Sequence, residues 1–93
     1  MKRLLLPTKA FLRSAARVGR KKPETGEDLR SALALLAEDA LDSRLKSHKL
    51  KGRLTGSWAC SAGYDLRIVF QFVKHNGKAA ILLEAVGTHD EVY

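Results

Sequence analysis

Two strands joined by a tight turn are the feature that most constrains how this chain can fold. Residues 66–73 (LRIVFQFV) are rich in branched and aromatic side chains, which favour strands. Asn76-Gly77 follows them, and this dipeptide is typical of a two-residue hairpin turn because both of its positions tolerate positive φ. The apolar residues 79–86 then predict the returning antiparallel strand. Residues 58–61 predict one further strand before this hairpin.

The first half of the chain predicts two amphipathic helices. Thr8 can cap the first helix, whose apolar residues recur at helical spacing: Phe11, Ala15 and Val18. The second helix ends near Leu41 and begins with acids in its first turn, and its apolar stripe has the same spacing: Leu29, Leu33, Leu36 and Ala40. The two helices in succession predict an antiparallel helical hairpin.

The order of these elements predicts the fold class. Residues 2–6 form a short apolar segment that Pro7 ends, which predicts an initial strand before the helices. The order β-α-α-β-β-β is typical of an α+β fold, a small antiparallel sheet with the N-terminal helical hairpin packed on one face. A chain of 93 residues is expected to form one domain, residues 1–93.

The positive charge of the chain is concentrated in two segments. Lys and Arg number 17 against 10 Asp and Glu, a net charge of +7. Residues 1–22 and 44–53 contain basic residues and no acid, whereas residues 24–42 are acidic apart from Arg30. Clustered cations favour polyanions because each neutralised phosphate releases counterions. Nucleic acid is therefore the favoured partner, and an acidic protein is the alternative.

Other features exclude whole classes of protein. No apolar run approaches the roughly 18–20 residues that would span a bilayer, and the first residues lack a secretory apolar region. Cys60, the single cysteine, cannot form an internal disulfide and is expected to be a small buried hydrophobe. The three histidines, at positions 48, 75 and 89, lack metal-ligand spacing. We therefore expect a cytoplasmic protein with no membrane association, metal or cofactor.

Four motifs in the second half resemble the RelE/ParE toxin superfamily, and its YafQ-like branch in particular. They are His48–Gly52 (HKLKG), Gly56–Trp58 (GSW), Tyr64–Phe70 (YDLRIVF) and Gly87–Tyr93 (GTHDEVY). The resemblance implies a toxin of a type II toxin-antitoxin module, restrained by a cognate antitoxin in a hetero-oligomer. Members that resemble YafQ or RelE cut mRNA in the A site of the 70S ribosome without a metal. ParE-like members instead poison DNA gyrase.

The resemblance also implies roles for single residues. His89 matches the C-terminal catalytic His and would act as general acid or base, and His48 would transfer a second proton or contact phosphate. Asp65 would act as base or orient a histidine, and Arg67, two residues on, would contact phosphate. Tyr93 matches the terminal aromatic and would stack on a base. The remaining RNA-binding candidates are cations of the basic segment: Lys46, Lys49, Lys51 and Arg53.

These residue types suit metal-free RNA cleavage. The reaction uses the 2′-hydroxyl of the RNA as nucleophile, so it needs a base for that proton and an acid for the leaving 5′-oxygen. Histidine titrates near neutral pH, and arginine can bind a phosphate through two parallel hydrogen bonds. Each role therefore has a candidate in this sequence.

Two positions depart from the YafQ-like pattern and keep other functions open. The pattern has a further His between the Trp and Asp motifs, and residues 59–64 contain none. It also has an Arg four residues before the C-terminal His, where this chain has Ala85. A ParE-like gyrase inhibitor and a catalytically weakened RNA- or antitoxin-binding member of the fold are therefore alternatives. The motif His48–Leu50 and the C-terminal His89 favour the ribosome-dependent endoribonuclease.

The candidate residues also have purely structural interpretations. His48 could be a solvated loop residue, Asp65 could cap a turn after Gly63, and Arg67 could belong to a structural ion pair. His75 lies beside the Asn-Gly turn and is given no role.

Overall fold

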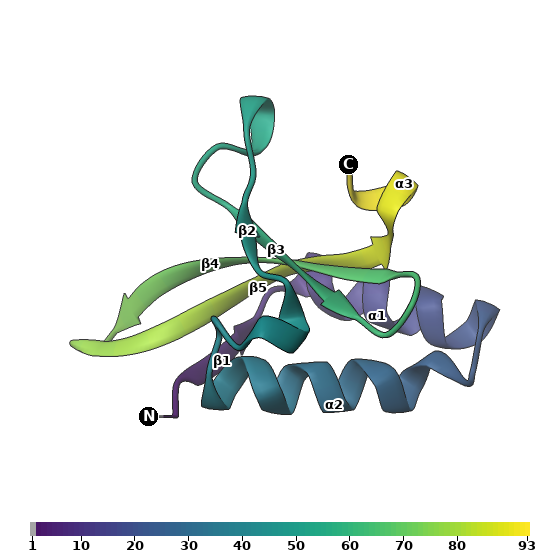
Figure 1. The fold of residues 1–93 in the computed structure, drawn as a ribbon, viewed down its shortest axis with the longest axis horizontal. Helices are drawn as coiled ribbons and strands as arrows, with labels where there is room; N and C mark the ends of the chain where they lie inside the picture. Colours follow the sequence, from purple (N-terminus) through teal and green to yellow (C-terminus); the bar gives the residue numbers. More distant parts are fainter. Residues whose placement is uncertain (1) are drawn as a thin grey trace.

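A long β-hairpin forms the centre of the molecule. In the computed structural model, which describes residues 2–93, β4 (Leu66–His75) pairs antiparallel with β5 (Lys78–Thr88) (Figure 1). Asn76 and Gly77 join them with φ values of 53° and 78°, the left-handed values that a type I′ turn requires. The predicted hairpin is confirmed, and its turn chemistry fixes the register of both strands.

The complete sheet has five strands in the order β1-β5-β4-β3-β2. β3 (Trp58–Ala62) lies antiparallel to β4, and β2 (His48–Lys49) antiparallel to β3. β1 (Leu4–Pro7) pairs parallel with β5, so the α+β class is confirmed but the sheet is mixed and not wholly antiparallel. Both helices separate β1 from the hairpin, and so long a connection lets a strand enter in either direction. β2 was not predicted because it is two polar residues long.

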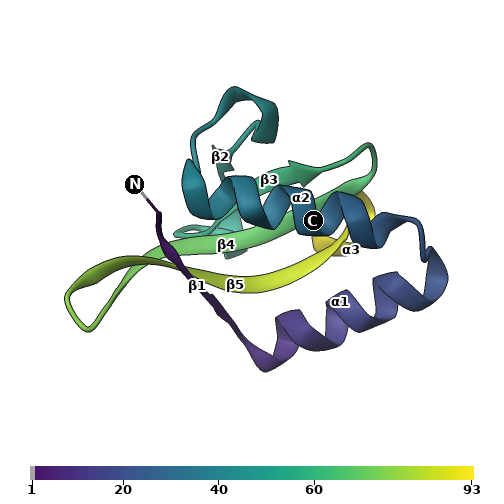
Figure 2. The same ribbon diagram turned by 90° about the horizontal axis from the view of Figure 1, so that it is seen from below.

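Two helices cover one face of the sheet, as predicted. α1 (Lys9–Lys21) packs chiefly against β5, and α2 (Thr25–Glu38) packs against β3 (Figures 1 and 2). The helices diverge from their connection, because their apolar stripes face the sheet more than each other (Figure 2). Thr8 caps α1 as expected: its Oγ1 accepts a hydrogen bond from the Phe11 amide at 3.1 Å.

Three short elements complete the chain. They are the 3₁₀ turns η1 (Ser43–Leu45) and η2 (Gly52–Leu54), and the final helix α3 (His89–Val92). The β2 segment with η2 and the helix α3 both rise from the sheet face opposite α1 and α2 (Figure 1). No helix among residues 2–93 has the length and apolar character to cross a membrane.

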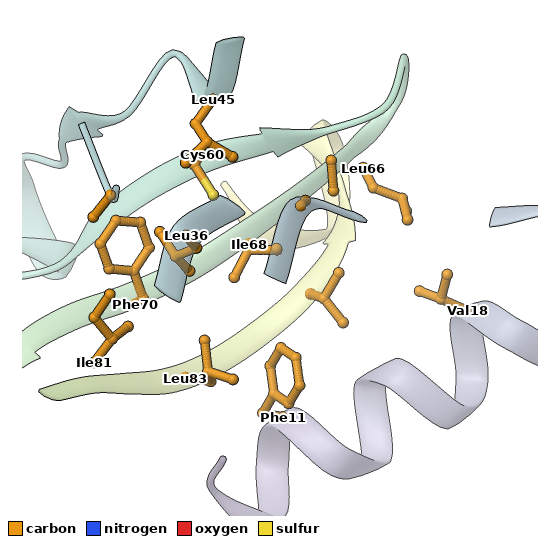
Figure 3. Close-up of a cluster of buried hydrophobic side chains, with 14 residues drawn as sticks. Phe11, Val18, Leu36, Leu45, Cys60, Leu66, Ile68, Phe70, Ile81 and Leu83 are labelled. Atoms are coloured by element: carbon orange, nitrogen blue, oxygen red, sulfur yellow. The ribbon is translucent and has the colours of Figure 1, made fainter. Parts of the chain in front are cut away.

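The two faces of β4 separate the core from the opposite side of the sheet. Ile68 and Phe70 are fully buried against the helices, where they meet Leu36 of α2 and Phe11 of α1 (Figure 3). Arg67 lies between buried neighbours and therefore projects from the other face. The helices thus use one face of the sheet for packing and leave the second, which we call the open face, for function.

Cys60 lies in this core with no exposed surface. Burial raises the pKa of its thiol to about 12, because the apolar surroundings disfavour the charged thiolate. The expectation of a small buried hydrophobe is confirmed. The folded-state pKa lies above the unfolded value of about 8.5. The contribution of the neutral, buried thiol to the free energy of unfolding is therefore complete below pH 8.5 and declines as pH rises towards 12.

We expect iodoacetamide to leave Cys60 of the folded protein unmodified at pH 8, because the thiolate is the reactive form. The same protein in concentrated urea should be modified completely, which mass spectrometry would measure. Equal modification rates with and without urea would contradict the buried position.

Candidate active site

A row of paired residues forms the floor of the open face. His48 of β2 lies opposite Ala59 of β3, Ala59 opposite Val69 of β4, and Val69 opposite Ala85 of β5. Directly paired residues project to the same face of a sheet, so these four side chains form one line across four strands. The floor consists of short apolar side chains, with the imidazole of His48 at its β2 end. Arg67, two residues before Val69 on β4, lies in the neighbouring row.

α3 stands at the other side of this floor, at the end of β5. A capping box fixes its first turn: Thr88 Oγ1 accepts from the Glu91 amide at 3.4 Å, and Glu91 Oε1 accepts from the Thr88 amide at 2.8 Å. His89 and Tyr93 are four residues apart and therefore lie on one side of this turn. Their rings meet edge to face with centroids 4.5 Å apart.

Tyr93 joins the two histidines, although they are far apart in sequence. Its hydroxyl lies 3.4 Å from His48 Nε2, and the two ring centroids are 6.4 Å apart. The structure therefore brings three of the predicted site residues, His48, His89 and Tyr93, into one cluster between β2 and α3.

The partners of His48 define its tautomer. Nδ1 lies 3.1 Å from the Lys46 carbonyl oxygen, which can only accept, so Nδ1 carries the proton. In the neutral ring with this tautomer, Nε2 is the acceptor for the Tyr93 hydroxyl. Burial raises the pKa of that hydroxyl, with the charge of Arg67 opposing, so Tyr93 stays protonated at neutral pH. The basic nitrogen of His48 therefore points towards α3.

Arg67 contributes positive charge to the same side of the sheet. Its Nη1 donates to the Leu66 carbonyl at 2.9 Å, which orients the guanidinium. The charge of Arg67 also acts on the Tyr93 hydroxyl, whose pKa it lowers against the larger effect of burial. No ion pair found between residues 2 and 93 involves Arg67. The alternative interpretation of Arg67 as a member of a structural ion pair is therefore not supported within residues 2–93.

Asp65 is placed away from the cluster. It belongs to the turn between β3 and β4, and its carboxylate lies 3.7 Å from Lys22 Nζ at the end of α1. It lines a cleft between this turn and the two helices, with Lys22, Thr25 and Asp28 among its neighbours. The structure therefore does not bring Asp65 to His48 or His89, because the turn directs its side chain towards the helices.

The basic segment surrounds His48 with exposed cations. Lys49 Nζ lies 5.8 Å from the centre of the Trp58 ring, a cation–π distance. Arg44 forms a two-pronged pair with Asp42 and is neutralised there. None of the ion pairs within the described residues involves the other cations of the segment: Lys46, Lys49, Lys51 and Arg53.

Sequence reasoning missed two polar contacts, the capping box of α3 and a hydrogen bond between Ser57 and Glu84. Thr88-x-x-Glu91 matches the capping-box pattern, so the sequence contained that signal. The buried Ser57, just before β3, donates to Glu84 Oε1 at 2.6 Å. Glu84 is the unpaired residue of a β-bulge, between Leu83 and Ala85. Nothing in the spacing of Ser57 and Glu84 could have indicated this contact.

The chemistry available to this arrangement is proton transfer and phosphate binding. In the part of the chain that the structure describes, no three His, Cys, Asp or Glu side chains gather closely enough to hold a metal ion. Two imidazoles and a guanidinium on one face are residue types that can serve as a base, an acid and a phosphate-binding cation.

Comparison with protein families gives one match over nearly the whole chain. Residues 3–93 match the model of the family described as the bacterial toxin of type II toxin-antitoxin system, YafQ. A search of curated protein sequences finds no match to this chain.

Known structures share the fold at low sequence identity. YafQ from E. coli strain BL21(DE3) is similar with a TM-score of 0.78 and 16% identity over 99% of each chain. The E. coli DinJ–YafQ toxin-antitoxin complex is similar with a TM-score of 0.75 and 17% identity, over 100% of this chain and 99% of the matched chain. A YoeB/ParE toxin from Agrobacterium tumefaciens is similar with a TM-score of 0.74 and 15% identity, over 92% of this chain and 98% of that toxin.

We expect Tyr93→Phe to release His48 without disturbing the fold, because it removes one exposed hydrogen bond and leaves the ring contact with His89. The ring-nitrogen resonances of His48 should shift in two-dimensional NMR spectra. Those of His75, exposed at the end of β4, are the control and should not move. An unchanged His48 spectrum would contradict the contact between Tyr93 and Nε2.

Proposed function

Since the chain belongs to the YafQ family of bacterial type II toxin-antitoxin toxins, we propose that it is a ribosome-dependent, metal-independent endoribonuclease that cleaves mRNA. The observation that carries the proposal is the meeting of His48 and His89 at Tyr93 on the open face. A protein that acted only by binding gyrase would not need two histidines from separate elements at one point.

The proposed reaction needs two proton transfers on opposite sides of a phosphate. One histidine takes the proton of the RNA 2′-hydroxyl, whose oxygen attacks the phosphorus. The bond to the 5′-oxygen breaks, and the other histidine gives that oxygen its proton, leaving a 2′,3′-cyclic phosphate and a 5′-hydroxyl. His48 is suited to be the base, because Nε2 is unprotonated in the tautomer set by Lys46. His89 then acts as the acid, and Tyr93 stacks on the base beside the cleaved bond.

Positive charge around the cluster would hold the RNA and stabilise the transition state. Arg67 acts electrostatically on the Tyr93 hydroxyl and is in none of the ion pairs of residues 2–93, so we assign it to the scissile phosphate. The exposed cations of the segment around β2 would bind the flanking phosphates: Lys46, Lys49, Lys51 and Arg53. Asp65 is left out of the proton-transfer set, because its carboxylate lies against Lys22.

A cognate antitoxin is the second proposed partner. The related E. coli YafQ has been seen in a complex with DinJ, and this chain matches that complex's toxin fold over its whole length. A basic toxin with net charge +7 would suit an acidic antitoxin segment, and the two would form a hetero-oligomer.

We expect His89→Gln to abolish in-frame, ribosome-dependent mRNA cuts, because glutamine cannot donate the proton at neutral pH. Loss of one general acid typically costs about 10²–10⁴ in rate. Primer extension in a translating bacterial extract would measure it, with His75→Gln as the matched control. If the His89→Gln variant still makes these cuts, a residue other than His89 is the general acid. No cuts by the folded, antitoxin-free protein would overturn the nuclease and leave gyrase inhibition to be tested.

We expect the double variant Lys51→Gln/Arg53→Gln to bind a single-stranded RNA oligonucleotide with weaker salt dependence. Two lost phosphate contacts should reduce the slope of log K against log salt by about 1.4, since each contributes about 0.7 on single strands. Lys74→Gln/Lys78→Gln removes the same charge at the tip of the β4–β5 hairpin and should leave the slope unchanged. Fluorescence anisotropy would measure both. An equal change in both double variants would show a non-specific charge effect.

A further inference from the structure

α3 is too short to be stable without other contacts. It contains four residues, His89–Val92, and an isolated helix of this length does not form in water. Both His89 and Tyr93 depend on its geometry, because they reach the cluster from one side of this turn. Some group must therefore hold α3 to the body of the protein.

Glu91 is the residue that makes this connection, and its two carboxylate oxygens point to different elements. Oε1 accepts from the Thr88 amide at 2.8 Å, which closes the capping box onto the end of β5. Oε2 lies 3.7 Å from Arg17 Nη2 and 3.8 Å from Lys21 Nζ. Arg17 and Lys21 are one turn apart on α1, so both cations face the same carboxylate.

The backbone at the end of β5 lets α3 approach closely. A Cβ atom at Gly87 would lie 3.0 Å from Glu91 Oε1, 3.1 Å from Glu91 Cβ and 3.3 Å from Val92 Cγ1. Gly87 of β5 is paired with Arg67 of β4, so the contact holds α3 to the strand next to the one that bears the proposed phosphate ligand. Glu91 is therefore packed between the strand, the turn and α1.

The ionised state of Glu91 suits this role. The Thr88 amide, followed by the charges of Arg17 and Lys21, holds the pKa of its carboxyl below the usual value. The group is therefore charged throughout the neutral range, in which the histidines would work.

We propose that Glu91 is a positioning residue that fixes α3 between β5 and α1 and so holds Tyr93 against His48 and His89 against Tyr93. Its effect on rate rests on the proposed nuclease function, whereas its effect on ring geometry does not. Glu91 has no place in the proton transfers themselves, because its carboxylate is held by Thr88 and α1.

The test compares Glu91→Ala with Glu91→Gln, which keeps an acceptor for the Thr88 amide but loses the charge. Glu38→Ala is the matched control, since Glu38 is exposed in the last turn of α2 and is in none of the ion pairs of the described residues. Ribosome-dependent cleavage gives kcat and KM. Nuclear Overhauser contacts between the ring protons of His89 and Tyr93 report the geometry directly.

Losing a helix cap typically weakens the helix by a factor of about five to ten in its equilibrium constant. Glu91→Ala should therefore lower kcat by about the same factor, with KM unchanged. Its His89–Tyr93 ring contacts should weaken, and Glu91→Gln should lie between it and the unsubstituted protein. If Glu91→Ala does not fold, the kcat, KM and His89–Tyr93 ring contacts of Glu91→Gln test the proposal instead.

Two results would overturn the proposal. Unchanged kcat and ring contacts in Glu91→Ala would mean that α3 is held by other groups. A lower KM with unchanged kcat would mean that Glu91 merely neutralises Arg17 and Lys21. If the unsubstituted protein does not cleave mRNA, the nuclease function fails, and loss of the ring contacts in Glu91→Ala still supports the positioning role.

Discussion

The pairing of β4 with β5 is the constraint on which the rest of the structure depends. Because side chains alternate along β4, the same strand sends Ile68 and Phe70 into the core and Arg67 to the open face. A register slip of one residue would exchange these sets and bury the guanidinium. The type I′ turn at Asn76-Gly77 excludes that slip, so the hairpin turn protects both the core and the site.

The candidate site is assembled from elements that each depend on this sheet. His48 reaches it only because β2 pairs with β3, and β3 with β4. His89 reaches it because β5 continues to Thr88, whose hydroxyl caps α3. Neither β2 nor α3 is long enough to hold its own geometry, so hydrogen bonds and ion pairs at their ends replace the packing that longer elements would have. Polar side chains therefore position the site, while apolar ones build the fold.

Much of the fold could be predicted from the sequence, because its signals are local. Asn76-Gly77 and the branched and aromatic side chains of residues 66–73 indicated the hairpin, and Thr8 indicated the start of α1. The parallel pairing of β1 could not be predicted, because it depends on where both helices return the chain. Asp65 shows the same limit within the site: two residues from Arg67, it faces Lys22, because it precedes the strand and follows the geometry of a turn. Proximity in sequence implies a shared face only inside a regular strand.

The floor of the open face explains how the departures from the YafQ-like pattern fit together. Ala85 and Ala59 lie in one row with His48, so the position that carries Arg in the pattern is here a methyl group at the β5 end of the floor. Positive charge is therefore displaced from the floor to Arg67 in the next row and to the segment around β2. In the proposed reaction the phosphate would be held from the sides of the floor, with the histidines at its two ends. This arrangement keeps two histidines and a guanidinium within one face while leaving the floor apolar, and an apolar floor strengthens each charged contact made above it.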